Sequence, residues 1–221
     1  MALMTTQQAA DRIGVSVRHV QRLVAGGDLT AIGPDRVDAA SVAQWVAQRQ
    51  GSRVRAWEEP TAWAAVALLE GQPAPWLGQP QRSRLRSTLA GATAAELVVR
   101  ARNRAAVHRF AAHPRALDRL ARAVITSGAA KDIAGLTATD RLDGYVDDAV
   151  LQRLVTQYRL DPDPGGNATL RATGMPIDVV AELAGGRRRV LAGWDLAGSA
   201  DARERSAGHR LLERAVERLR G

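Results

Sequence analysis

Two short amphipathic segments joined by a tight glycine turn open the chain, and they constrain its fold more than any other feature. Thr5 and Gln8 match a capping box, in which each side chain accepts a hydrogen bond from the backbone N–H of the other residue. A helix therefore begins at this pair and runs to about Ile13. Gly14 ends it, because glycine adopts the left-handed conformation of a helix terminus without steric cost.

The second segment begins at Ser16, whose hydroxyl can accept a hydrogen bond from a free N–H of the first helical turn. Val20, Leu23 and Val24 follow at spacings of three and four, so they form one inward-facing stripe of a helix. Two glycines at residues 26–27 end this helix. The sequence thus predicts two capped helices with a short turn between them.

The following residues predict a small wing and a third helix. In residues 29–38, LTAIGPDRVD, two short extended pieces flank the turn signal Gly33-Pro34-Asp35. Residues 40–48 place Val42, Trp45 and Val46 on one helical face, and the polar stretch 50–55 indicates a linker. Helix, turn, helix, wing and helix fit within residues 1–50, which we predict to be one small domain.

Three segments of this region, TTQQAADRIGVS, VQRLVAGGDL and VDAASVAQWV, resemble the excisionase-type helix-turn-helix of the MerR-like superfamily. The resemblance implies a winged domain that binds double-stranded DNA with its second helix in the major groove. Arginine pairs well with guanine and glutamine with adenine, so Arg18, Arg22 and Gln21 are the expected base-reading residues. The full set of expected DNA contacts is Ser16, Val17, Arg18, His19, Gln21 and Arg22 on the second helix, and Arg36 at the tip of the wing. A wing with one arginine departs from relatives that carry several, and a plain helical hairpin is the alternative.

The composition and motifs of the sequence exclude several classes of function. The chain has no cysteine, which excludes disulfides, thiolate catalysis and cysteine-ligated zinc. Its four histidines are scattered without metal-ligand spacing, so we expect no metal and no cofactor. Phosphate-loop, nucleophile-elbow and zinc-protease motifs are absent from the sequence, and we therefore expect that the protein is not an enzyme.

The apolar stretches predict no membrane contact. The run at residues 62–69 is eight residues long, whereas a span needs about 18 or more. A secretory leader does not precede the first predicted helix, so we expect a cytoplasmic protein.

The formal net charge of +8 fits a polyanionic partner. Residues 82–122 alone carry ten basic and two acidic side chains. Such a stretch can extend a phosphate-contacting surface, because neutralising phosphates supplies much of the affinity for DNA. A solvated helix face in an arginine-rich protein is the alternative, and the sequence does not separate the two.

Residues 57–221 predict a helical region followed by a mixed one. Helical signals fall at residues 59–71, 82–89, 93–110 and 114–124. Later signals are a helix at 148–158, a strand at 168–172, an extended segment at 189–196 and an amphipathic helix at 201–219. The fold class is therefore mainly α (α+β), with a basic helical middle region at 57–125 and an α+β region with a small sheet at 126–221. One domain over 57–221 is the alternative.

This larger region resembles the C-terminal region of actinobacterial AbiEi-type antitoxins of type IV toxin-antitoxin systems. The segments that carry the resemblance are TAWAAVALLEG, HPRALDRLARAVITSG, GYVDDAVLQRLVTQYRLDP, GNATLR and VLAGWDLAGSADARERSAGHRLLE. It implies a repressor of its own operon that counters a nucleotidyltransferase-type toxin. The residues to test first for antitoxin function are Trp194, Asp195, Arg203 and Arg205, with bracing of the fold as their alternative role. Many AbiEi proteins carry a different winged helix at the N-terminus, which is a departure.

Two other functions fit the same sequence. A stand-alone helix-turn-helix transcription factor would use its larger domain for ligand binding or dimerisation, and an excisionase-like architectural factor would bend DNA. Two-fold operators are common for this motif, which favours a homodimer on DNA. The expected partners are thus double-stranded DNA at the protein's own operator, a nucleotidyltransferase-type toxin and a second copy of the chain.

Overall fold

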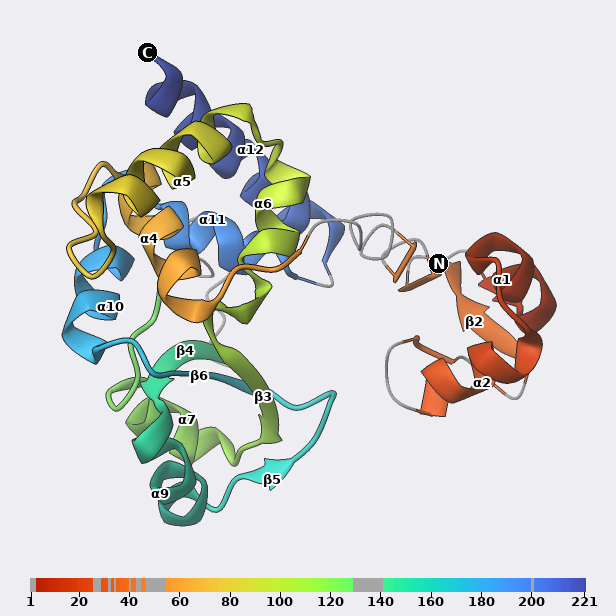
Figure 1. Ribbon diagram of the computed structural model, residues 1–221. Helices are drawn as coiled ribbons and strands as arrows, with labels where there is room; N and C mark the ends of the chain where they lie inside the picture. Colours follow the sequence, from red (N-terminus) through yellow and green to blue (C-terminus); the bar gives the residue numbers. More distant parts are fainter. Residues whose placement is uncertain are drawn as a thin grey trace. The chain divides into compact units, whose positions relative to one another are not determined.

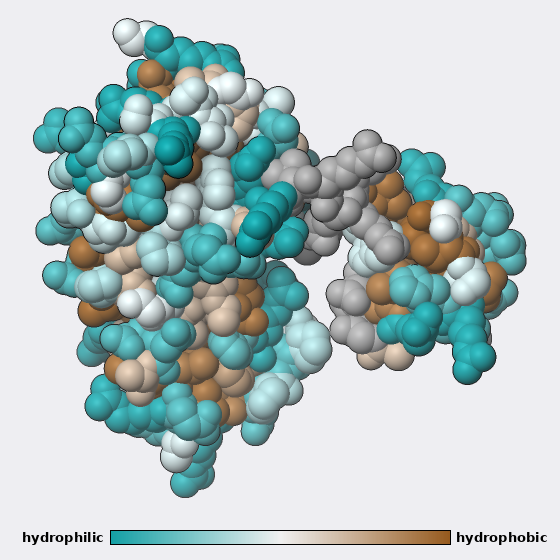
Figure 2. All heavy atoms as spheres, in the orientation of Figure 1, coloured by the Kyte–Doolittle hydropathy of each residue, from teal (hydrophilic) through white to brown (hydrophobic). Residues whose placement is uncertain are grey.

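The computed structural model describes residues 3–25, 29–31, 33, 35–39, 41–42, 45–46, 55–128, 141–199 and 201–221. Contacts within the chain divide it into two compact units, Met1–Val54 and Arg55–Gly221, both drawn in Figure 1. The fold is α+β, with a helix-turn-helix at the N-terminus. On the face shown in Figure 2, hydrophilic residues cover much of each unit, and smaller apolar patches are exposed among them.

Helices α1 (Thr6–Ile13) and α2 (Val17–Ala25) form the helix-turn-helix of the first unit. The predicted capping box is confirmed, since Gln8 N donates to Thr5 Oγ1 at 3.1 Å and Thr5 N donates to Gln8 Oε1 at 2.9 Å. Two reciprocal bonds satisfy N–H groups that would otherwise have no partner at the helix start.

The turn between these helices is built from local hydrogen bonds. Gly14 has a φ of 75°, the left-handed conformation, and its N–H donates to Ala10 O at 2.9 Å. Ser16 Oγ accepts from His19 N at 3.3 Å, which caps the start of α2 as predicted. The local sequence therefore specifies both the end of α1 and the start of α2.

A small sheet completes the first unit. Strand β1 (Leu3–Thr5) pairs antiparallel with β2 (Arg36–Asp38). Ala31 forms an antiparallel bridge with Val37, which closes the predicted hairpin at residues 29–38. β1 was not predicted, because three residues directly before a helix are too few to show alternation.

The described core of the first unit consists of Ala9, Ala10, Val20, Leu29, Val37 and Val42. Residues 39, 41–42 and 45–46 are helical, and Trp45 and Val46 pack against this core as predicted. The predicted helix end at residues 26–27, the turn residue Pro34, the other positions of the 40–48 helix and linker residues 50–54 lie outside the described residues.

The larger unit has a layer of helices built around α4 (Glu59–Glu70). Residues 62–70 of α4 are all buried, and Figure 1 shows the other helices of this layer around it. These helices are α5 (Gln79–Gly91), α6 (Ala94–Arg100), α10 (Ile177–Ala184), α11 (Val190–Ala197) and α12 (Ala202–Arg220). The helices predicted at 59–71, 82–89 and 201–219 are confirmed, whereas α10 was not predicted.

The end of α4 is fastened to the start of α11. No side chain of α11 caps its own first turn, and its N-cap residue is Arg189. Instead the buried carboxylate of Glu70 accepts hydrogen bonds from Val190 N at 3.1 Å and from Arg188 N. A carboxylate at a helix N-terminus is stabilised by the free N–H groups and by the helix dipole.

The segment 189–196, predicted as extended, is the helix α11, and this prediction was wrong. Every residue of α11 is buried, so its apolar run has no helical period and resembles a buried strand. The helix crosses α12 closely, since a β-carbon at Gly208 would lie 2.3 Å from Ala197 N and 2.6 Å from Gly193 O. Glycine is therefore the residue that this crossing requires at position 208.

A four-stranded sheet, in the order β4-β6-β3-β5, forms the other part of the larger unit. Its strands are β3 (Ala106–Ala111), β4 (Leu142–Asp147), β5 (Asp161–Pro162) and β6 (Ala168–Thr173). β4 and β6 are parallel and are joined through α9 (Asp148–Tyr158), while β3 is antiparallel to β6. A second core cluster lies between one face of the sheet and the helices α7 (Pro114–Ala121) and α9 (Figure 1). The strand at 168–172 and the helices at 114–124 and 148–158 are confirmed.

Residues 93–110 do not form the single helix that was predicted. α6 ends at Arg100, the short 3-10 helix η2 (Arg102–Arg104) follows, and β3 begins at Ala106. Alanine and arginine favour a helix here, but residues 106–110 pair with residues 168–172 of β6. Tertiary pairing overrides local propensity at this position.

Candidate nucleic-acid interface

The outer face of α2 carries the polar residues that the sequence singles out. Arg18, Gln21 and Arg22 are exposed, and spacings of three and four place them on one stripe of the helix. Val20, on the other side, is fully buried in the core of the first unit. α2 contains no acidic residue, so its solvent face is basic and polar.

The other three residues predicted to contact DNA at α2 have different positions. Arg22 Nη2 donates to the Nδ1 atom of half-buried His19 at 3.0 Å, which orients the guanidinium. Val17 packs against the core, so it does not share the stripe. Exposed Ser16 stands at the N-terminus of the helix, where free N–H groups favour a phosphate.

The wing is held against the start of α1. Thr6 N donates to Asp35 O at 3.3 Å, and Thr6 Oγ1 donates to the Asp35 carboxylate. Arg36 follows directly as the first residue of β2, where it is exposed and paired with Thr5. Its guanidinium therefore extends from a fixed strand rather than from a free loop tip.

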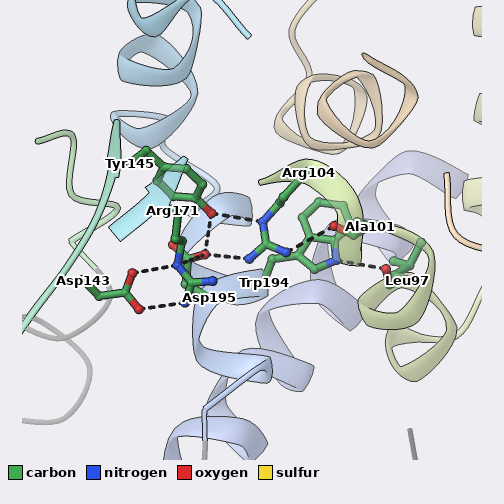
Figure 3. Close-up of polar contacts among 8 residues, drawn as sticks. All are labelled: Leu97, Ala101, Arg104, Asp143, Tyr145, Arg171, Trp194 and Asp195. Carbon is green, nitrogen blue, oxygen red and sulfur yellow. Dashed lines mark hydrogen bonds and ion pairs between the residues drawn. The ribbon is translucent and has the colours of Figure 1, made fainter. Parts of the chain in front are cut away.

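A second group of charged residues lies inside the larger unit, between the sheet and the helices (Figure 3). The Asp195 carboxylate of α11 accepts hydrogen bonds from Arg104 Nη2 at 2.7 Å and from Tyr145 Oη at 2.6 Å. Arg171 of β6 lies 3.6 Å from the same carboxylate and pairs with both oxygens of Asp143, at 2.6 and 2.7 Å. We call these five residues the internal ion network.

The electrostatics of the internal ion network suit a structural role. Burial would raise the pKa of Asp195, but the guanidinium groups of Arg171 and Arg104 outweigh it and hold this pKa below its ordinary value. Burial raises the pKa of Tyr145, so its hydroxyl remains a donor. The ionised Asp195 carboxylate thus pairs with Arg104 of η2 and Arg171 of β6 and joins the helices to the sheet.

The residues expected for antitoxin function fall into two groups. Trp194 and Asp195 are buried, and Trp194 Nε1 donates to Leu97 O at 3.1 Å. They cannot touch a partner in this fold. Near the start of α12, Arg203 is exposed and half-buried Arg205 donates from Nη1 to Ser199 O at 2.9 Å.

Arg104, Tyr145 and Arg171 were not identified from the sequence as partners of Asp195. The available signal was the alternation in residues 168–172, which places Arg171 on the sheet face opposite Leu170. The pattern says nothing of what covers that face. Arg104 and Asp195 are 91 positions apart, so their pairing appears only once the layers are assembled.

The basic stretch at 82–122 does not form one surface. Helix α5 packs on the helical core through Leu85 and Leu89, and α7 packs on the sheet core through Leu117 and Leu120. Figure 1 shows these two helices at opposite ends of the larger unit, so their arginines lie far apart. Arg104 is buried in the internal ion network, and Arg100 lies over the Trp57 ring at 5.7 Å. The central charge excess is thus divided among separate parts of the larger unit.

Comparison with known proteins adds one match. A family model described as a helix-turn-helix domain matches residues 3–50. No curated protein and no solved structure matches the chain. Within the described residues, no helix is long and apolar enough to cross a membrane, and no group of three or more His, Asp or Glu side chains could hold a metal ion.

Proposed function

We propose that this protein is a transcriptional regulator that recognises a specific duplex DNA site with α2 and acts by binding alone. The observation that carries the proposal is the exposed stripe of Arg18, Gln21 and Arg22 on the second helix of a helix-turn-helix domain. The family match supports the docking expected for this motif, with the second helix in the major groove and the first across the backbone.

The chemistry of the stripe fits base edges. The guanidinium groups of Arg18 and Arg22 can donate two parallel hydrogen bonds to guanine O6 and N7, and the amide of Gln21 can pair with adenine N6 and N7. Ser16 and Arg36 flank these residues and would contact phosphates. His19 reduces the rotational freedom that Arg22 loses on binding, because the guanidinium is already oriented.

The experiment selects bound sequences from a pool of random duplexes with the full chain and then measures affinities of single variants. For the selected site we expect Arg18→Ala, Gln21→Ala and Arg22→Ala each to lose about 1–3 kcal/mol of binding free energy. Arg119 is an exposed arginine on α7. The variant Arg119→Ala removes the same charge from the larger unit and is the matched control. An equal loss on unrelated duplexes would assign a variant's side chain to phosphate contact. Failure to enrich any sequence at low salt would refute the proposal.

We further propose that the DNA site is the operator of the protein's own operon, bound by a homodimer in the cytoplasm as a repressor. Two-fold operators favour dimers of this motif. A reporter fused to the native promoter should be repressed by the wild type and released by Arg22→Ala, and the mass of the complex should correspond to two chains per site. Equal reporter output with both proteins, or one chain per site, would contradict this.

The larger unit is our candidate for countering a nucleotidyltransferase-type toxin. In support, the segments that resemble AbiEi antitoxins fold into one compact unit, as α4, α7, β4 with α9, β6, and α11 with α12. Exposed Arg203 is the first of the four expected residues to test, because Trp194 and Asp195 are in the core.

The test coexpresses the full chain with a nucleotidyltransferase encoded by an adjacent gene. Wild type and Arg22→Ala should both rescue growth, which separates antitoxin action from DNA binding, and Arg203→Ala should rescue less. A growth defect that the wild type leaves unchanged would exclude the antitoxin role.

A further inference from the structure

A groove of about 620 Å³ lies between the connection at residues 71–78 and the first turns of α5, within the larger unit. Its volume is in the range of pockets that hold small molecules. The connection is rich in proline, and α5 carries no acidic residue. The groove is separate from the internal ion network and belongs to the other unit from α2.

One face of α5 supplies the polar wall. Gln79, Arg82, Ser83 and Arg86 line the groove, and their spacing of three, four and seven is that of a single helical stripe. Among the residues that the structure describes, no acidic side chain lines the groove. Two guanidinium groups, a hydroxyl and an amide therefore face one space without a carboxylate to neutralise them.

The two arginines differ in how they are held. Arg82 Nη1 donates to Ala74 O at 3.3 Å and to Leu77 O, which fixes the connection against α5. Arg86 is exposed, and no side chain or carbonyl in the described part of the chain pairs with it. A third guanidinium, that of Arg188, packs against Gly71, a lining residue, and donates from Nη1 to Leu69 O at 3.0 Å.

The connection contributes apolar and rigid residues to the lining. Pro73 and Pro75 line the groove together with the buried side chain of Leu68. Proline fixes its backbone φ, so this part of the lining loses little freedom when a ligand packs on it. A ligand that fits both parts of the lining carries an anionic group at one end and a flat or apolar body at the other.

We propose that this groove binds a small phosphorylated molecule of about nucleotide size. A phosphate monoester carries up to two negative charges and three acceptor oxygens, which matches neighbouring guanidinium groups better than a single carboxylate does. Arg86 supplies the free donor, Arg82 the fixed positive charge and Ser83 a hydroxyl, while the two prolines pack against the body of the ligand. The proposal does not depend on DNA binding by the first unit.

The experiment titrates the full chain with adenosine 5'-monophosphate, adenosine and citrate by calorimetry, and follows amide chemical shifts in residues 71–91. We expect binding of the monophosphate at submillimolar concentration, with shifts confined to this segment, and binding of adenosine and citrate at least about tenfold weaker. Arg86→Ala should weaken binding of the monophosphate at least about tenfold. Arg86→Lys should weaken this binding less, because lysine keeps the positive charge but loses the paired N–H donors of the guanidinium.

Arg84→Ala is the matched control, because Arg84 is exposed on the same helix but does not line the groove, and it should bind as the wild type does. Thermal midpoints confirm that each variant is folded. Monophosphate binding that survives Arg86→Ala but is lost in Arg22→Ala would place the ligand on α2 and overturn the proposal. So would the absence of heat and of shifts at millimolar monophosphate, or equal affinity for adenosine.

Discussion

Arginine side chains have different surroundings in the two units of this protein. On α2, Arg18 and Arg22 are exposed and the core of the unit forms without them, whereas Arg104 and Arg171 keep only 8% and 12% of their side chains exposed and join the sheet to the helices. The guanidinium groups on α2 are available for binding, whereas those of the internal ion network stabilise the larger unit. Partners supplied by the fold, rather than composition, decide between the two uses.

The largest effect should come from the carboxylate that both buried arginines share. Asp195→Asn removes the negative charge, which leaves buried Arg104 without a carboxylate and Arg171 with Asp143 alone, so we expect the larger unit to lose about 3–5 kcal/mol of its free energy of unfolding. Hydrogen exchange measured peptide by peptide separates the units, and protection in α1 and α2 should stay unchanged. A loss below about 1 kcal/mol would show that the network contributes little.

The same carboxylate should make the larger unit sensitive to acid. Because the pKa of Asp195 is lower in the folded chain than its unfolded value of about 3.9, the unfolded chain binds more protons between these two values. The stabilisation is present above about pH 4 and is lost as the pH falls through the folded pKa. Unfolding measured from about pH 6 to about pH 3 should show a steeper loss for the wild type than for Asp195→Asn. Parallel curves would contradict the lowered pKa.

A smaller effect is expected where α11 and α12 cross. Gly208→Ala would place a methyl group against the backbone of Ala197 and Gly193, so the larger unit should lose about 1–3 kcal/mol. Gly91→Ala at the end of α5 meets nothing within 4 Å and should change stability by about 0.5 kcal/mol or less. Equal urea midpoints for the two variants would show that α11 and α12 can move apart with little loss in the free energy of unfolding.

In the first unit, the capping box gives the next smaller effect. Thr5→Ala removes the hydroxyl that accepts from Gln8 N, and we expect a loss of about 1 kcal/mol confined to the first unit. Hydrogen exchange in α1 should rise while that of α4 stays constant. Faster exchange in both units would mean that they unfold together.

The smallest stability effect should come from the residues proposed to contact DNA. Arg18→Ala should change the free energy of unfolding by about 0.5 kcal/mol or less, because the side chain is exposed and has no partner in the described residues. Thermal unfolding of the full chain tests this. A loss above about 1 kcal/mol would place Arg18 with the structural arginines and end the contrast between the units.

What the sequence predicts well is local. The capping residues Thr5 and Ser16, the stop at Gly14 and the alternation at residues 168–172 depend on neighbours a few positions away, and the structure confirms each of them. The stripe on α2 follows from the same helical spacing. The role of this stripe in contacting DNA stays a prediction until binding of the variants is measured.

What the sequence predicts poorly depends on distant partners. β3 was expected to be helical because its residues favour a helix, and its strand form depends on pairing with β6, about 60 positions away. α11 is surrounded by other elements and therefore shows no polar face that would reveal its period. Asp195 was identified as a candidate, but the residues that hold it, Arg104, Tyr145 and Arg171, come from three separate elements, and no local pattern links them.

The hydrogen bonds between Glu70 and the start of α11 affect the order in which the chain can fold during its synthesis. The hydrogen-bond partners of Glu70 are 118 and 120 positions further along, so α4 emerges from the ribosome long before the residues that cover it. The first unit is by then fully synthesised and can fold on its own local contacts. During translation the apolar surface of α4 therefore stays uncovered until α11 has been synthesised. In a nascent chain that stalls before α11, this surface is accessible to chaperones and proteases.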